Sequence, residues 1–231
     1  NPRVEIHMKL SRKLFISVAM CGLLLGGCTS TITSKEQFSG FLPNYNNLQE
    51  TTSPSGHKVL RWVAPGFSPD AYDTVVIKGL ELYPEPKPNE RVSQQTLQEL
   101  QAFASSRAKS VLAQKYQVVS SLEAVPAGSR TLIMRAAITG VSASNEGMRW
   151  YEVVPVAAVL GATQAATGHR SQDTELFIEA DFVDAATGLP VVKVVRKVLG
   201  ETLKNSSQPV TANNFKAAIT GLTNDLQAFI K

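Results

Sequence analysis

Cysteine and histidine are scarce in this sequence, and their scarcity excludes several kinds of chemistry. The 231 residues include two cysteines, Cys21 and Cys28, and three histidines. Zinc sites typically take three or four such ligands, and the chain contains no P-loop, Gly-x-Ser-x-Gly or His-Glu-x-x-His sequence. His57 lies in a polar stretch and His169 follows a glycine, so both are expected at the surface. We therefore predict no metal, no cofactor and no enzymatic activity.

The sequence also lacks an apolar run at its start that could span a membrane comfortably. The run from Leu14 to Leu25 is shorter than the roughly 20 residues that a spanning helix needs. A basic cluster at positions 9–13 precedes this run, and small residues follow it. These are the three parts of a secretory signal. Met8 is the expected start of the signal, because Pro2 and Glu5 are not typical of its basic first part.

The signal ends in a tetrad, Leu25-Gly26-Gly27-Cys28, that resembles the bacterial lipobox. In a lipobox the cysteine thiol takes a diacylglyceryl group, and a signal peptidase that recognises the three preceding residues then cleaves before the cysteine. We expect Cys28 to be the lipidated first residue of the mature chain and its membrane anchor. The alternative is an ordinary signal with an incidental cysteine. Thr29 stands where an aspartate would favour the inner membrane, so the expected location is the periplasmic face of the outer membrane.

Little net charge remains once the signal is removed. Residues 1–27 hold four of the 23 basic and one of the 19 acidic side chains, which leaves 19 basic and 18 acidic residues and a net charge of +1. No nucleic-acid partner is expected, because such binding requires a concentrated basic face. The remaining roughly 200 residues suffice for one sizeable core. We predict a flexible tether at 28–37, rich in serine and threonine, and a single globular domain at 38–231.

Hydrophobic patterns predict an α/β (α+β) domain. A helix capped by Ser93 is expected to run to about Gln117, and its buried stripe is Leu97, Leu100, Ala104, Ala108, Val111, Leu112 and Tyr116. From Thr211, an amphipathic helix presents to the sheet Phe215, Ile219, Leu222, Leu226 and Phe229. Another helix is expected at 155–167, and strands at 58–63, 74–82, 117–120, 130–142, 148–154, 174–184 and 189–199. The sheet is expected to be mixed and largely antiparallel, with the helices packed on it.

Several short motifs follow one another along most of the mature chain. They are Ser39-Gly40-Phe41-Leu42 with Tyr45 and Leu48, Arg61-Trp62 with Pro65 and Tyr72, Leu132 to Thr139, and Glu179 with Asp184-Ala185-Ala186-Thr187-Gly188. In this order the motifs resemble the bacterial lipoproteins catalogued as domain of unknown function 3313. That family has no established activity, so the resemblance supports localisation and fold more than function.

Three acidic residues of one predicted strand, Glu175, Glu179 and Asp181, are expected on the same face, since side chains alternate along a strand. Such carboxylates could serve acid–base chemistry or bind a cation. The structural alternative is that the following hairpin places Glu179 opposite Lys193 and Glu175 opposite Lys197, because opposite charges across strands are stabilising. We favour the structural role.

Two other segments each have two interpretations. Phe38, Phe41, Leu42 and Tyr45 either dock the entry segment onto the domain or form an exposed patch for a partner. Small residues at 157, 161 and 165 permit close helix approach, either for self-association or membrane contact, or because that helix lies on its own sheet, which we favour.

The first functional hypothesis is a non-enzymatic interaction or assembly module with an envelope protein partner. The second is a binding or carrier protein for a small envelope ligand, lipid or glycan. It requires an apolar pocket of roughly 300–1,000 Å³ between the sheet and the segment at 155–167. A hydrolase ranks third, because it needs a pocket that joins a histidine to one of the acids.

Overall fold

The structure is a computed structural model that describes residues 32–144 and 171–231. Several predicted features lie outside these residues. They are Cys28 with its recognition residues Leu25, Gly26 and Gly27, the strand at 148–154, the helix at 155–167 and His169.

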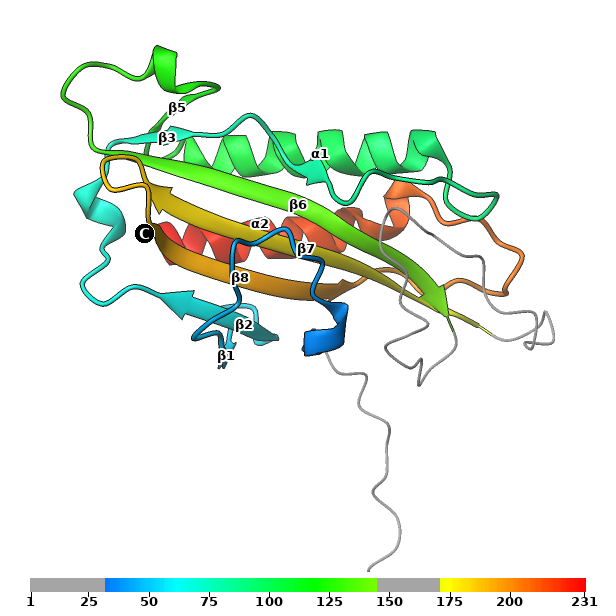
Figure 1. Cartoon of the computed structure of the whole chain (residues 1–231). Coiled ribbons are helices and arrows are strands. Elements are labelled where there is room, and N and C mark those ends of the chain that lie inside the picture. The colour runs from blue at the N-terminus through cyan, green and yellow to red at the C-terminus, as the bar shows by residue number, and fades with distance from the viewer. Residues whose placement is uncertain (1–31, 145–170) are drawn as a thin grey trace, which may run out of the picture.

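The described strands form one mixed sheet in the order β1-β2-β8-β7-β6-β3-β5, with β4 also paired to β6 (Figure 1). Pairing is antiparallel from β1 to β6, whereas β3, β4 and β5 join in parallel. The α+β domain with a mixed sheet is therefore confirmed. The strands are β1 (Gln49–Thr52), β2 (Lys58–Val63), β3 (Thr74–Val76), β4 (Glu81–Leu82), β5 (Gln117–Val119), β6 (Thr131–Ser144), β7 (Asp173–Asp184) and β8 (Pro190–Leu199).

The two described α-helices, α1 (Gln94–Leu112) and α2 (Lys216–Ile230), cover one face of the sheet. A 3-10 turn at Ala212–Phe215 leads into α2. In Figure 1 both helices lie behind the sheet, while the blue segment at 32–48 crosses its front. The sheet is thus covered on both sides, by helices on one face and by an irregular segment on the other.

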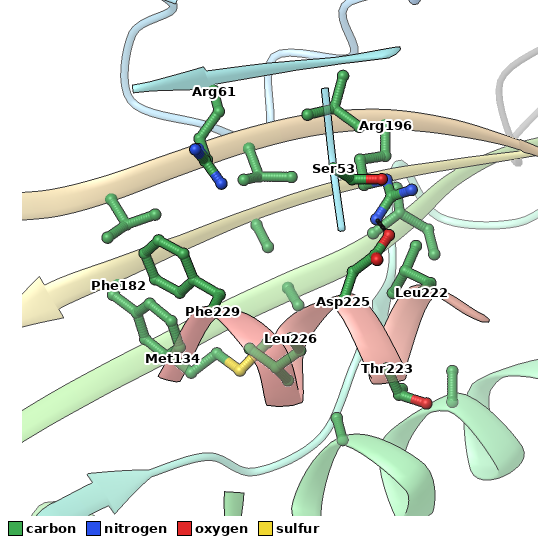
Figure 2. Close-up of a pocket in the computed structure, with 18 of the residues that line it drawn as sticks. Ser53, Arg61, Met134, Phe182, Arg196, Leu222, Thr223, Asp225, Leu226 and Phe229 are labelled. Carbon is green, nitrogen blue, oxygen red and sulfur yellow. Dashed lines mark hydrogen bonds and ion pairs between the residues drawn. The ribbon is translucent and has the colours of Figure 1, made fainter. Parts of the chain in front are cut away.

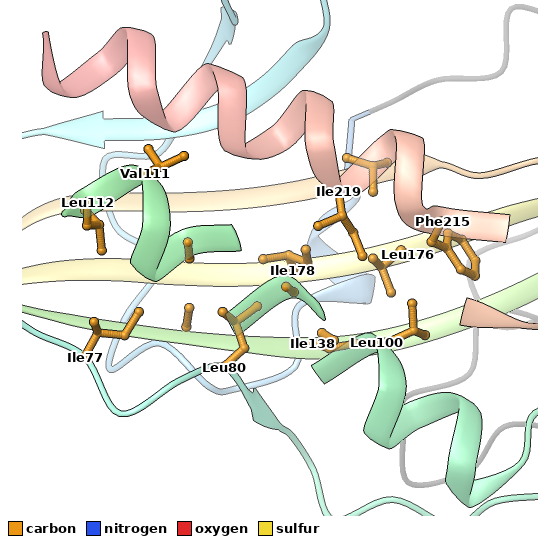
Figure 3. Packing of buried hydrophobic residues seen from close by; sticks show 14 of the residues in the cluster. Ile77, Leu80, Leu100, Val111, Leu112, Ile138, Leu176, Ile178, Phe215 and Ile219 are labelled. Carbon is orange, nitrogen blue, oxygen red and sulfur yellow. The ribbon is translucent and has the colours of Figure 1, made fainter. Parts of the chain in front are cut away.

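Helix α1 begins and packs as its sequence predicts. The backbone N–H of Thr96 donates to the Ser93 hydroxyl at 3.1 Å, which satisfies a first-turn donor that lacks a helical partner. All seven residues of the predicted stripe are buried. They join the side chains of β6 and β7 in the core shown in Figure 3. The helix ends at Leu112, about one turn before the predicted end.

Helix α2 packs closely at its start and loosely at its end. Phe215 and Ile219 have no exposed surface, whereas Leu222, Leu226 and Phe229 are half-exposed although they belong to the same predicted stripe. The amphipathic pattern correctly identified the helix, but it did not predict that the second half of the stripe stays open. This opening creates the candidate site.

Three local differences from the predicted elements have simple causes. Strand β1 was not predicted, because its sequence, Gln-Glu-Thr-Thr, is polar throughout and has no apolar alternation. The predicted strand at 74–82 is two short strands, and between them Gly79 adopts φ +149°, a conformation that favours glycine. Part of the predicted tether is folded: Thr33 is buried, and Lys35–Gln37 form a 3-10 turn.

Candidate functional site

An apolar cavity of about 120 Å³ lies between the second half of α2 and the sheet, and it opens to solvent (Figure 2). We call the cavity and its mouth the α2 groove. Its floor is a row of small side chains on three adjacent strands, where Ala180 of β7 pairs with both Ala136 of β6 and Val194 of β8. Its roof is formed by the half-exposed side chains Leu222, Leu226 and Phe229 of α2.

The groove exists because the side chains on the sheet beneath α2 are too short to fill the space under the helix. Ala136 and Ala180 have no atoms beyond Cβ, so the side chains of α2 above them lack neighbours that larger residues would provide. An unfilled apolar cavity costs about 24 cal/mol per Å³. For 120 Å³ this would be about 3 kcal/mol in an enclosed cavity, and the cost is smaller here because the cavity opens to solvent. An apolar ligand that filled the cavity would recover much of this free energy.

A buried ion pair closes one end of the groove. The Arg196 guanidinium on β8 donates to the Asp225 carboxylate on α2 at 2.8 Å, and Ser55 donates to the same carboxylate from its backbone N–H at 2.8 Å and its hydroxyl at 2.7 Å. The two charged side chains are less than a tenth exposed. Burial disfavours the charged carboxylate, but the hydrogen bonds from Ser55 and Arg196 outweigh it and hold the pKa of Asp225 below its ordinary value.

Because these two polar side chains occupy the space between β8 and α2, they hold the middle of the helix at a fixed place above the sheet. The turn between β1 and β2, which carries Ser55, is fixed by the same contacts. The pair thus acts as a spacer at one end of the α2 groove.

Arg61 of β2 lies at the mouth of the groove. Its guanidinium carbon is 5.4 Å from the centre of the Phe229 ring, and the side chain is half-buried. The pattern of β2 contained a signal for this placement, because Val59, Arg61 and Val63 alternate and share the face that packs against the helix side. A charge between two apolar residues on such a face is unusual, yet Arg61 was expected only as part of a family motif and not as a site residue.

On the opposite face of the sheet, Glu179 binds the entry segment. Its carboxylate accepts the Ser39 backbone N–H at 2.8 Å and the Tyr45 hydroxyl at 2.6 Å, although Glu179 is only 1% exposed. Burial, together with the hydrogen bond to Glu179, raises the pKa of Tyr45 to about 12. The Tyr45 ring stacks on Phe38 with centroids 4.4 Å apart. Residues from two separate family motifs, 39–45 and 179, therefore meet in one contact.

The structure favours docking for the predicted aromatic patch. Leu42 is 3% exposed, and Phe38, Phe41 and Tyr45 are half-buried. Phe41 makes an edge-to-face contact with Tyr83 at 5.6 Å. These four side chains fix the entry segment to its own domain, so the groove replaces them as the candidate site.

The three predicted acids do share a face, but each has a structural partner. Asp181 is paired with Arg135, Glu179 binds the entry segment, and Glu175 lies 3.5 Å from the ammonium of Lys197. His57, the one histidine among the described residues, is exposed in the turn between β1 and β2, so the three acids are engaged with the partners named above instead. The structural interpretation of the acids is therefore supported.

The predicted register of the β7–β8 hairpin was wrong by two residues. Glu179 pairs with Val195 instead of Lys193, and Glu175 pairs with Leu199 instead of Lys197. Two differences of one residue add up: beside the turn, Val183 pairs with Pro190 instead of the expected Leu189, and β8 has one extra residue between the partners of Phe182 and Val183. A shift of two residues preserves the face of every side chain, so the acids and lysines stay on one side.

In residues 32–144 and 171–231, no three histidine, cysteine, aspartate or glutamate side chains are grouped so that they could hold a metal ion. Within the same ranges, no helix has the length and apolarity required to cross a membrane.

The fold and the motifs define an α+β domain of a known family. The chain matches the model described as "Protein of unknown function (DUF3313)" over residues 37–226, and it belongs to that family. A curated relative from Escherichia coli strain K12, the "Uncharacterized lipoprotein YdcL", is 46% identical over 212 residues, which cover 91% of this chain and 93% of the relative. The resemblance noted from the sequence motifs is thus confirmed.

Solved structures with a similar chain path are distant in sequence. A PelC dodecamer from Paraburkholderia phytofirmans has 13% identity and a TM-score of 0.38, covering 72% of this chain and 96% of that one. Protein XCC0632 from Xanthomonas campestris has 12% identity and a TM-score of 0.36, covering 73% and 91%. Similarity at this level carries no argument about function.

Proposed function

We propose that this chain is a non-enzymatic lipoprotein, anchored through Cys28 at the periplasmic face of the outer membrane, that binds an apolar ligand in the α2 groove. The lipobox-like tetrad before Cys28 supports the anchor, as does a relative that is named a lipoprotein. Thr29 supports the choice of the outer membrane.

The observation that carries ligand binding is the open apolar cavity beneath α2. It is smaller than the pocket expected from the sequence, and it lies beneath α2, while the segment at 155–167 is outside the described residues. An apolar cavity of about 150 Å³ is enough to bind benzene, so this one accepts a short stretch of hydrocarbon. Because the cavity is open, a longer chain can continue along the mouth.

A photo-crosslinking experiment on the intact lipidated protein tests this function. Met134 points into the groove and lies beside Leu226 (Figure 2). The sequence has four methionines, of which Met8 and Met20 belong to the signal and Met148 is the other mature one. Cells that incorporate photo-methionine, a diazirine analogue of similar size, would therefore place one crosslinker in the groove without a mutation.

After irradiation of the envelope, mass spectrometry of the peptide that contains Met134 should reveal a small hydrocarbon-containing adduct. Met134→Leu is the matched control, since it conserves volume but removes the crosslinker. Ala180→Leu should abolish the adduct, because the added carbons fill the cavity. A crosslink to a polypeptide would show that the groove binds a protein partner, and no adduct above the control would overturn ligand binding.

A further inference from the structure

Within the part of the chain that the structure describes, Arg61 differs from two other arginines that lie against the sheet, because no protein anion is paired with it. Arg196 is paired with Asp225 and Arg135 with Asp181. For the Arg61 guanidinium, neither a hydrogen bond nor an ion pair is found within residues 32–144 and 171–231, and its recorded polar contact is with the face of the Phe229 ring. A half-buried guanidinium that keeps its five donors available is a natural partner for a carboxylate or a phosphate.

The charge balance around the mouth is positive. Asp225 is the acid at the far end of the groove, and Arg196 and Ser55 already satisfy its carboxylate. Asp181 contributes to the floor, but its carboxylate points to the opposite face, where it binds Arg135. Among the described residues, the positive charge of Arg61 is therefore left without a paired anion beside the cavity.

Apolar walls begin directly beside this charge. Phe229 contacts the Arg61 guanidinium, and Met134 and Phe182 line the same part of the cavity (Figure 2). A ligand that bound both the Arg61 charge and the apolar walls would have an anionic group attached directly to a hydrocarbon chain.

Building on the proposed function, we infer that the ligand of the α2 groove is a single-chain anionic amphiphile. Its head group binds the Arg61 guanidinium, and its hydrocarbon chain enters the cavity over Ala180. The charge-assisted hydrogen bonds at the mouth set the preference for an anionic head, and apolar contact in the cavity provides the rest of the affinity. A carboxylate and a phosphate monoester share the required chemistry.

The test uses the lipidated, photo-methionine-labelled protein in its native membranes. Three deuterated probes are added separately: oleate, 1-oleoyl-lysophosphatidate and the uncharged oleyl alcohol. Adducts on the Met134 peptide are counted by their isotopic label and divided by the amount of probe in the membrane. The variants are Arg61→Gln, which removes the charge, Arg61→Lys, which retains it, and Lys204→Gln, which makes the same charge change at an exposed residue elsewhere.

We expect at least one anionic probe to give about tenfold more adduct than oleyl alcohol, because charge-assisted hydrogen bonds are roughly twice as strong as neutral ones. Arg61→Gln should remove this preference, Arg61→Lys should retain part of it, and Lys204→Gln should leave it unchanged. The comparison of oleate with lysophosphatidate identifies which head group is bound.

Three results would overturn the inference, in two distinguishable ways. Equal labelling by both anionic probes and oleyl alcohol in the unmodified protein, or a preference that survives Arg61→Gln, would show that Arg61 does not bind the head group while the groove still binds hydrocarbon. No adduct with any probe would contradict both the inference and the proposed function.

Discussion

Removal of the Asp225 carboxylate should destabilise the domain strongly, and the structure allows the size of the effect to be worked out. Asp225→Ala deletes three hydrogen bonds, two from Ser55 and one from Arg196. It also leaves the Arg196 guanidinium buried without an anion. Removal of one partner from a buried ion pair typically costs about 3–5 kcal/mol. For a domain of this size, 1 kcal/mol corresponds to roughly 2–4 °C in Tm, so Tm should fall by roughly 6–20 °C.

The double variant Asp225→Leu with Arg196→Met separates this explanation from a simple loss of contacts. Buried ion pairs replaced by apolar residues of similar volume are often neutral or stabilising, so the double variant should recover most of the Tm lost in Asp225→Ala. Thermal unfolding of the purified lipidated proteins, followed by circular dichroism, measures both effects. A loss in Asp225→Ala below about 1 kcal/mol would refute the reasoning, since it would mean that the pair carries no uncompensated buried charge.

The pH dependence provides a second measurement of the same interaction. The pKa of Asp225 is lower in the folded chain than in the unfolded one, where it is about 3.9. Folding therefore favours the charged form, and this contribution is complete above the unfolded pKa and is lost as pH falls through the folded pKa. The unmodified protein should lose stability below about pH 4 more steeply than Asp225→Ala.

Three further substitutions test other parts of the structure. Tyr45→Phe should cost about 1.5–3 kcal/mol of stability, measured by urea unfolding, which is the usual value of a hydrogen bond to a charged group such as Glu179. Because the pKa of Tyr45 is raised to about 12, the stability that its hydroxyl contributes is lost as pH rises through that value. The stability difference between the variant and the unmodified protein should therefore shrink there. Gly200→Ala should cost roughly 1–3 kcal/mol, measured by Tm, because the new Cβ would meet Thr174 and lie 2.7 Å from a backbone carbonyl. Ala180→Leu adds three carbons to the cavity and should stabilise the ligand-free domain by up to about 2 kcal/mol, measured by urea unfolding; a loss of stability would show that the cavity cannot accept them.

Local periodicity predicted much of the fold because local contacts determine it. The predicted stripe contains seven residues at helical spacing, six of them in α1 and Tyr116 just beyond its end, and all seven are buried. Strand β2 has the predicted bounds, because it is rich in β-branched, aliphatic and aromatic residues and both of its neighbours pair with it.

The α2 groove could not be predicted in this way, because no local pattern contains it. Ala136 and Ala180 are 44 positions apart and become neighbours only through the β6–β7 register. That register in turn depends on an irregularity at Ile138 and Gly140, which a sequence does not reveal. The stripe of α2 predicted which side chains face the sheet, but whether they reach it depends on the size of the residues opposite.

The position of the entry segment adds an argument about the ligand. Residues 33–48 dock on the face of the sheet opposite to the helices. If Cys28 is acylated as proposed, the four residue-to-residue steps from Cys28 to Ile32 can span at most about 14 Å, so the face that carries the entry segment stays close to the bilayer. The α2 groove then opens on the side of the domain away from the anchor, and a ligand must leave the membrane to enter it. Each methylene withdrawn from hydrocarbon costs about 0.8 kcal/mol, so a lipid with two chains faces about twice the cost of a lipid with one. This geometry independently favours the single-chain amphiphile over a diacyl phospholipid as the occupant of the groove.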